Sequence, residues 1–419
     1  MPKLGKKMLS LQPLAKQFVA PDDSVLGPLS SGENRSHGKG HAARAERSLT
    51  GLDTTYARMI QAAFRPEWWR SPAIVTYDAA GSPSFSSLPG EDAGDQGDSK
   101  HGGKGHGKQK ENGRHDDSGD GSGGDGSSNP PRLTTGQYSV MEANFSLFFG
   151  LSVQLYLSTL VADDTPFDRF LDGRAEALTA PQQAGLQLFF GKAGCARCHA
   201  GPELTEASFS QCAREPIDDD FTTLSGVEAR YDKGFINTGV RPVGDDPGIG
   251  GSDPFGSPLA DTRRLKLGLL PPGAFNLDVG PQDPIAVDGA FKIPGLRSVE
   301  LTAPYFHNGG MATLEQVVEF YNRGGDFGQQ DRDDVRDFMR PLGLTTAEQA
   351  ALVAFLKSLT DERVRYEQAP FDHPQIFVPN GHPTFGGHIV ADEDGRAVDD
   401  LIEIRAVGAG GGAALQPVF

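Results

Sequence analysis

One short motif limits what this chain can fold into more than any other feature. It reads Cys195-Ala196-Arg197-Cys198-His199 and lies just before the middle of the chain, within GKAGCARCHAGP. Two thiols at this spacing can add to the two vinyl groups on one edge of a porphyrin, and a histidine directly after the second cysteine then faces the iron. The motif therefore predicts one covalently attached c-type haem, bound through Cys195 and Cys198 with His199 as an axial ligand of the iron.

Two other kinds of site use a CxxC pair. A thioredoxin-like redox site needs the two thiols alone, and a structural zinc site needs a second pair of ligands. The chain has only 3 cysteines, so it offers no second pair and no disulfide framework. A redox dithiol has no use for His199, and the third cysteine, Cys212, is expected to be an inert buried thiol.

The net charge and the apolar segments limit the kinds of partner that the chain is expected to bind. A formal charge of -17 at pH 7 disfavours nucleic acid and anionic membranes, and it would steer a basic redox protein towards the chain. The basic start, residues 1–7, is not followed by an apolar run, so no secretion signal is evident. The most apolar stretch, residues 145–161, is interrupted by polar residues and is predicted to be a buried helix instead of a membrane span.

Periodic segments on both sides of the motif predict helices. Thr179 and Gln182 form a capping-box pattern, with Pro181 in the first turn of a helix that runs to Phe190. An apolar face in 314–321 predicts a second helix, and Thr345 with Glu348 caps a third whose apolar stripe ends at Leu359. A helix before the motif and an amphipathic helix about 150 residues after it are typical of a class I cytochrome c domain.

Glycine and proline make up about a fifth of the chain and are concentrated in a few stretches. Two low-complexity inserts cannot bury enough apolar surface to offset the entropy lost on ordering, so they are expected to be disordered. The Gly/Pro/Asp-rich segment 212–291 is expected to be mostly irregular. The expected organisation has five parts: a partial helical region over 1–77 with a disordered insert at about 30–47, a disordered Gly/Ser/Asp-rich insert over 78–136, a helical connection over 137–178, a cytochrome c-like haem domain over 179–361, and an extended tail over 362–419. The expected fold class is mainly α, with long irregular loops in the haem domain.

The sixth iron ligand would decide the chemistry of the haem. A methionine suits electron transfer, a tyrosine oxygen stabilises ferric or higher-valent iron, and an open position admits peroxide. Spacing does not choose among the candidates that follow the motif, which are Met311, Met339, Tyr305, Tyr321, His307, His373, His382 and His388.

Several segments in order along the chain resemble the bacterial di-haem cytochrome c peroxidase family, which includes the relative that matures the tryptophan tryptophylquinone cofactor of methylamine dehydrogenase. They cover about 160–360, and further similarity lies upstream in KKMLSLQPLAKQFVAPDDSVLG and YSVMEANFSLFFGL. The matching segments are TLVADDTPFDRFLDG, LTAPQQAGLQLFFGKAGCARCHAGPELT, FINTGVRP, FKIPGLRSVELTAPYFHNGGMATLEQVVEFYNRGG and LGLTTAEQAALVAFLKSLT.

The resemblance assigns roles to particular residues. It makes His199 the proximal ligand of the C-terminal, electron-entry haem and puts the distal ligand at Tyr321, where ordinary peroxidases have methionine and the quinone-maturing relative has tyrosine. It further implies a calcium ion held by the backbone carbonyl groups of Thr302 and Pro304, although this turn could equally be structural. His307 is a family residue near the haem, with a structural role as plausible as a catalytic one.

The chain departs from the family in one respect, because it has no second CxxCH motif. It therefore looks like the C-terminal portion of a di-haem peroxidase. General acid–base catalysis of peroxide cleavage contributes roughly 10²–10⁴-fold to the rate, and this contribution would be lost without another source of the acid and base. The catalytic residues are not assigned.

Three functions are compatible with these features. The first is a peroxidase-type oxidoreductase that reduces hydrogen peroxide with electrons from a small cytochrome or cupredoxin, together with a possible separate N-terminal haem domain or subunit. The second is a mono-haem electron-transfer cytochrome without peroxidase activity. The third and weakest is a remnant that carries no haem. The family implies a periplasmic location, since c-type haem is attached outside the bacterial cytoplasm.

Overall fold

The computed structural model describes residues 2–32, 50–79, 81–87 and 133–415. The disordered insert expected at about 30–47, and most of the one expected over 78–136, lie outside these ranges. Within them the chain forms two compact units, and each is described here by itself. The first unit comprises residues 1–17 and 29–159, and the second comprises 18–28 and 160–419.

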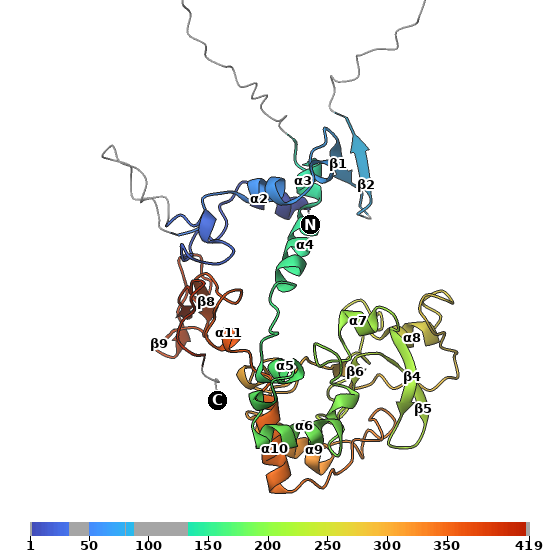
Figure 1. Ribbon diagram of the computed structural model, residues 1–419. Helices are drawn as coiled ribbons and strands as arrows, with labels where there is room; N and C mark the ends of the chain where they lie inside the picture. The colour runs from blue at the N-terminus through green and yellow to red at the C-terminus, as the bar shows by residue number, and fades with distance from the viewer. Residues whose placement is uncertain (1, 33–49, 80, 88–132, 416–419) are drawn as a thin grey trace, which may run out of the picture. The chain divides into compact units, whose positions relative to one another are not determined.

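The first unit combines short helices with one small antiparallel sheet (Figure 1). Its apolar centre is formed by Ile60 of α2 together with Phe145 and Phe148 of α4. Strand β2 lies inside the stretch 78–136 that the sequence predicts to be unstructured, so regular structure extends into that stretch. The elements are α1 (Pro2–Met8), α2 (Tyr56–Ala63), β1 (Ile74–Tyr77), β2 (Pro83–Ser86), β3 (Tyr138–Ser139), α3 (Val140–Ala143) and α4 (Phe145–Leu157), and the strand order is β2-β1-β3.

Helix α4 corrects one expectation from the sequence. The predicted helix is present, but it is not buried, because Leu147, Phe149 and Leu155 are each more than half exposed. Only Phe145 and Phe148 are buried. Apolar composition identified the helix correctly, but composition carries no information about which partner covers it. None of the helices in the described ranges is long and apolar enough to cross a bilayer.

The second unit contains the main helical core (Figure 1). Helices α6 and α9 both pack against α10. Phe355 of α10 lies at the centre, with its ring 5.1 Å from that of Phe189 and 5.3 Å from that of Phe167. The helices are α5 (Pro166–Leu171), α6 (Ala180–Phe190), α9 (Leu314–Arg323) and α10 (Thr346–Lys357).

The sequence signals for these helices are confirmed at the level of hydrogen bonds. Reciprocal capping boxes join Thr179 to Gln182 at α6 and Thr345 to Glu348 at α10. Gly185 makes the crossing of α6 and α10 possible, because a Cβ atom there would overlap the backbone carbonyl group of Ala351. The helix before the motif and the late amphipathic helix therefore do pack on each other.

The rest of the second unit consists of short elements joined by loops. The Gly/Pro-rich segment expected to be irregular contains the hairpin β4–β5 and helix α8, and β6 pairs with the more distant β7. These elements are α7 (Phe209–Cys212), β4 (Ile217–Thr222), β5 (Glu228–Asp232), β6 (Phe235–Ile236), α8 (Asp261–Lys266) and β7 (Phe291–Lys292). The C-terminal part adds α11 (Glu362–Arg365), β8 (Ile376–Pro379), β9 (Thr384–Phe385), β10 (His388–Ile389) and β11 (Leu401–Ile404).

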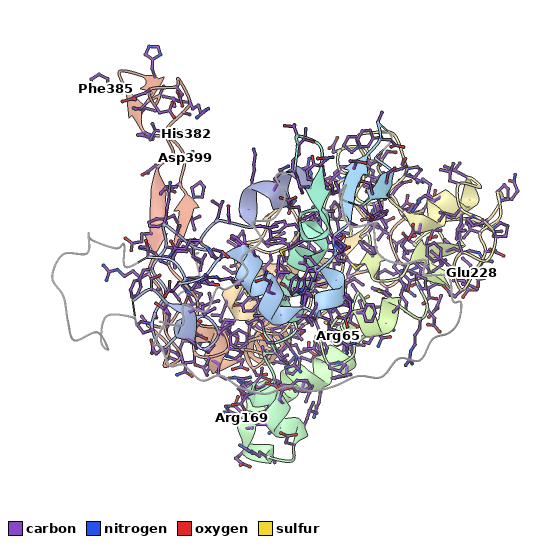
Figure 2. The ribbon with its side chains drawn as sticks, turned by 90° about the horizontal axis from the view of Figure 1, so that it is seen from above. Arg65, Arg169, Glu228, His382, Phe385 and Asp399 are labelled. Atoms are coloured by element: carbon purple, nitrogen blue, oxygen red, sulfur yellow. The ribbon has the colours of Figure 1, made fainter. Side chains whose placement is uncertain are left out.

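The expected fold class is confirmed in part. Regular structure is largely helical, and the described residues also form five small antiparallel sheets, so the class is mixed. Two of the hairpins lie in the tail, where β8 pairs with β11 and β9 with β10. Figure 2 shows this part of the tail projecting from the second unit, with Phe385, His382 and Asp399 towards its tip.

Candidate functional site

The CxxCH motif directly follows helix α6. After the helix ends at Phe190, Gly194 adopts a left-handed conformation with φ of 65° and starts the 3-10 turn η5 (Cys195–Arg197). The turn continues when the His199 amide donates to the Cys195 carbonyl oxygen across 3.0 Å. Cys195 packs against the helical core, whereas Cys198 packs against the cluster of Phe221, Ala229, Tyr231, Ile236, Ala286 and Ile293.

The His199 ring is held by backbone carbonyl groups. Its Nδ1 lies 3.1 Å from the carbonyl oxygen of Leu204, which can only accept, so Nδ1 carries the proton and Nε2 carries the lone pair. Burial lowers the pKa of His199 below its ordinary value, although the carbonyl groups of Leu204 and Pro294 oppose this shift. A neutral imidazole with a fixed tautomer is the form that binds a metal.

The two thiols are not activated. Burial raises the pKa of Cys195 to about 11 and that of Cys198 to about 12, and the nearby Glu206 carboxylate adds to the second shift. Redox-active CxxC pairs have a lowered thiol pKa, so this environment disfavours a dithiol site. No group of three or more His, Cys, Asp or Glu side chains in the described ranges is arranged to hold a metal ion.

Helix α9 brings Tyr321 towards the two cysteines. Its ring contacts Phe320 and Phe306, and its hydroxyl lies near the side chain of Thr238. Burial raises the pKa of Tyr321, and the Cys198 and Cys195 sulfur atoms are close enough to raise it further. The structure therefore brings Tyr321 into the same region as the motif, although 122 residues separate it from His199.

The other candidate iron ligands lie in three kinds of place: the apolar cluster around Tyr321, hydrogen-bonded positions, and the C-terminal tail. Met311 and Met339 lie in the apolar cluster that also contacts Tyr321. The hydroxyl of Tyr305 donates to the Val299 carbonyl oxygen, and His373 is bound by Glu367 at 2.9 Å. The last two histidines, His382 and His388, lie in the projecting tail, where His388 is exposed.

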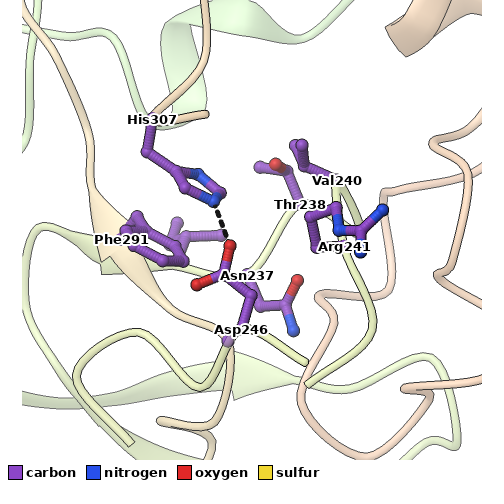
Figure 3. A pocket seen from close by; sticks show the side chains of 9 residues that line it. Asn237, Thr238, Val240, Arg241, Asp246, Phe291 and His307 are labelled. Carbon is purple, nitrogen blue, oxygen red and sulfur yellow. Dashed lines mark hydrogen bonds and ion pairs between the residues drawn. The ribbon is translucent and has the colours of Figure 1, made fainter. Parts of the chain in front are cut away.

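His307 belongs to a small polar pocket of its own (Figure 3). Its Nε2 lies 2.6 Å from a carboxylate oxygen of Asp246, and its ring stacks on Phe291 with centroids 3.5 Å apart. The enclosed space of about 20 Å³ is enough for one water molecule. Thr238 lines the same pocket and lies near Tyr321, and Phe306, the neighbour of His307 in the chain, contacts the ring of Tyr321.

The suggested calcium ligands lie in the loop before α9. Thr302 follows the 3-10 turn η6 (Val299–Leu301), and its hydroxyl donates to the Val299 carbonyl oxygen across 3.0 Å. Pro304 follows a cis peptide bond. The hydrogen bonds of the described residues leave both carbonyl groups without a donor, which is compatible with a cation but equally with a solvated turn.

Three supporting residues could not be identified from the sequence. Leu204 contributes only its carbonyl group, and Thr238 contacts Tyr321 from a loop 83 residues earlier in the chain. Arg297 forms a two-pronged ion pair with Asp168 and donates to the carbonyl oxygen of Pro202, which ties the loop after the motif to helix α5. No spacing rule joins residues this far apart, so the sequence carries no signal for these contacts.

These observations fit a covalently bound haem. The two uncharged thiols, the tautomer of His199 and the nearby phenol of Tyr321 provide attachment atoms, one axial ligand and a candidate for the second.

Comparison with known proteins agrees with this chemistry. The chain is 34% identical over 207 residues to the cytochrome-c peroxidase IdrP2 of Denitromonas iodatirespirans, an alignment that covers 49% of this chain and 47% of the relative. About half of the chain is thus similar in sequence to cytochrome c peroxidases and to MauG. The methylamine utilization protein MauG of Methylorubrum extorquens is 29% identical over 204 residues, with 49% of this chain and 41% of that protein covered. The cytochrome c peroxidase Ccp of Escherichia coli is 32% identical over 187 residues, with 44% and 30% covered.

The chain thus spans about half the length of its first relatives in this family. No family model matches it. Among solved structures, a MauG-like protein associated with microbial copper homeostasis is 30% identical with a TM-score of 0.32, over 50% of this chain and 55% of that one. The diheme peroxidase BthA of Burkholderia thailandensis is 23% identical with a TM-score of 0.35, over 56% of each chain. TM-scores this low support no argument about the fold.

Proposed function

We propose that this chain is a haem c oxidoreductase of the di-haem cytochrome c peroxidase type, which passes electrons through the haem at Cys195 and Cys198 for the reduction of hydrogen peroxide. One observation carries the proposal: the neutral, hydrogen-bonded imidazole of His199 directly follows two uncharged thiols. The relatives named as cytochrome-c peroxidases support the reaction class.

Each residue of the site would have a separate role in holding the haem. Cys195 and Cys198 would hold the haem by thioether bonds, and the haem would supply one-electron redox chemistry. The Leu204 carbonyl accepts from Nδ1 of His199, which fixes the ring orientation and would make Nε2 a stronger donor to iron. Tyr321 would be the distal ligand, with the side chain of Thr238 near its hydroxyl.

Further features follow from the same proposal. Residues 179–361 form a class I cytochrome c-like haem domain, in which the packed helices α6 and α10 are the crossing pair. Thr302 and Pro304 hold calcium through their carbonyl groups. The partners are a small cytochrome or cupredoxin as electron donor, and a second haem domain or subunit, in the periplasm.

A second function is favoured by one observation, the single CxxCH motif in the sequence. With one haem, the chain would act as a mono-haem electron-transfer cytochrome that relays electrons to a separate catalytic subunit. In that case it would have no peroxidase activity of its own.

Measurements on protein produced together with a cytochrome c maturation system would distinguish these two functions. Mass spectrometry gives the number of attached haems, the absorption spectrum gives the ligand field, and peroxide consumption is followed with a reduced small cytochrome. Peroxide turnover by material with one haem supports the peroxidase. An ascorbate-reducible haem without turnover supports the relay, and colourless protein from a working maturation system overturns both.

A further inference from the structure

The base of the C-terminal tail holds a histidine whose two ring nitrogens both face acceptors. Nε2 of His373 lies 2.9 Å from a carboxylate oxygen of Glu367, and Nδ1 lies 2.8 Å from the carbonyl oxygen of Pro374. A carbonyl oxygen can only accept, and so can an ionised carboxylate. A neutral imidazole has one N–H group and satisfies one of these neighbours, whereas the imidazolium cation has two and satisfies both.

This histidine also begins the hairpin of the tail. His373 and Val407 exchange two backbone hydrogen bonds, of 3.2 and 3.0 Å. From this pair the two strands continue as β8 and β11, where Ile376 lies opposite Ile404, and the hairpin extends towards the projecting tip (Figure 2). His373 and Val407 are therefore the pair at the end of the hairpin that joins the rest of the second unit.

The segment 18–28 meets the tail at the same place. The amide and the hydroxyl of Ser24 both donate to the carboxylate of Asp372, the residue before His373, each across 2.5 Å. On the other strand, the amide of Ala409 donates to the carbonyl oxygen of Asp22 across 3.0 Å. The base of the hairpin thus joins residues from both ends of the second unit.

The charges at this base are mainly negative. Four carboxyl groups lie there, those of Asp22, Asp23, Glu367 and Asp372. Arg363 and Arg365 of α11 form ion pairs with other carboxylates, and Arg405, two residues before Val407, is exposed. A protonated His373 is therefore the cation that faces these carboxyl groups directly.

The environment of the ring favours its protonated form. His373 and Glu367 are each only 17% exposed. Burial by itself would lower the pKa of His373, but the Pro374 carbonyl group and the Glu367 carboxylate outweigh it and raise the pKa above its ordinary value. A group of this kind contributes stability that is complete below its unfolded value, about 6.5 for histidine, and that is lost as the pH rises through the folded-state pKa.

We propose that His373 is a proton-operated clamp at the base of the tail, in which the protonated ring ties Glu367 to the first pair of the hairpin and loss of the proton loosens that pair. In the neutral ring, one nitrogen presents a lone pair either to the Glu367 carboxylate or to the Pro374 carbonyl oxygen, so one of the two contacts becomes repulsive. The clamp is closed in acidic medium and opens in alkaline medium. It depends on neither haem nor peroxide.

NMR titration of the full chain with ¹³C-labelled histidine is the first test. The spectra of His373→Gln and His388→Gln assign the two signals, and His388 is the exposed reference in the same tail. We expect the ring of His373 to keep its proton to a higher pH than that of His388. Glu367→Gln should move the titration of His373 to lower pH. A His373 signal that titrates with that of His388, or below it, would overturn the clamp.

Hydrogen–deuterium exchange with mass spectrometry then shows whether the proton holds the hairpin. The amides of His373 and Val407 are the donors of the first pair. After correction for the intrinsic effect of pH on exchange, we expect the protection of peptides that contain these amides to fall about fivefold or more as the ring deprotonates. His373→Gln is neutral at every pH and should show the lower protection throughout, whereas His388→Gln should behave like the unmodified protein.

Corrected exchange in the unmodified protein that does not change with pH would refute the clamp, whether or not any variant folds. An equal change in His373→Gln would refute it as well, because another group would then carry the pH dependence. Neither measurement involves a redox reaction. A failure here therefore leaves the proposed peroxidase function untouched, and a protein without haem leaves the clamp untouched.

Discussion

The Nδ1 atom of His199 donates to the carbonyl oxygen of Leu204, five residues further along the chain, across 3.1 Å. Leu204 adopts a left-handed conformation with φ of 52°, so the loop doubles back to aim this carbonyl group at the ring. The tautomer of the imidazole is therefore set by the backbone and not by a side chain, and a substitution at position 204 that keeps the conformation would leave it unchanged.

Replacing both motif cysteines should abolish covalent haem attachment. Cys195→Ala combined with Cys198→Ala removes both atoms that form thioether bonds. The measurement is haem staining of denatured protein on a gel. Cys212→Ala is the matched control, because this free thiol hydrogen-bonds to the carbonyl groups of Glu206 and Lys233 and not to the motif. Staining that survives the double substitution would refute the attachment.

Replacing His199 should separate attachment from ligation. In His199→Ala the two thiols remain, so we expect covalent haem with an altered absorption spectrum, because the iron has lost an axial nitrogen. Addition of imidazole should restore much of the original spectrum by filling the space of the missing ring. A variant with the unchanged spectrum would show that His199 is not a ligand.

Tyr321→Phe should change the ferric spectrum and the reduction potential, since a phenol oxygen on iron stabilises the ferric state. Tyr305→Phe is the control, because the hydroxyl of Tyr305 is bound by the Val299 carbonyl oxygen. If both variants keep the spectrum and the potential of the unmodified protein, Tyr321 is not the distal ligand, and Met311 or Met339 becomes the next candidate.

The helix crossing at Gly185 should not tolerate a side chain. Gly185→Ala places a methyl group where the carbonyl group of Ala351 lies, and overpacking of this kind costs about 1–3 kcal/mol. Gly150→Ala in α4 is the opposite case, because the space around that position is open, and we expect it to be neutral or stabilising by about 0.5–1 kcal/mol. Urea unfolding of both variants measures the difference, and equal stabilities would contradict the packing.

Asp334 should destabilise the protein as the pH rises. Burial and the nearby Asp288 carboxylate raise the pKa of Asp334 to about 7, so the folded state holds its proton more tightly than the unfolded state does. Stability from this group is complete below about pH 4 and is lost as the pH rises to about 7.

Asp334→Asn removes that dependence. We expect the variant to gain about 1–2 kcal/mol over the unmodified protein at pH 7.5 and little at pH 4, a discounted value because the carboxyl group is only partly buried. Thermal unfolding at the two pH values measures this, with Asp333→Asn at an exposed position as the control. A gain that is equal at both pH values would contradict the raised pKa.

The sequence by itself determined the local features. The spacing of Cys195, Cys198 and His199 is chemical information that needs no fold, and the capping boxes at α6 and α10 depend on residues three apart. Hydrogen bonds over this range are fixed by nearby residues, so pattern and structure agree.

Only the tertiary structure decided what surrounds these elements. It exposed α4 although its composition predicted burial, and it paired strands where glycine and proline predicted irregular loops. It also selected the carbonyl of Leu204 for His199 and brought the side chain of Thr238 close to Tyr321. These contacts join residues whose separation along the chain has no fixed relation to their distance in space, because packing of the whole unit sets that distance.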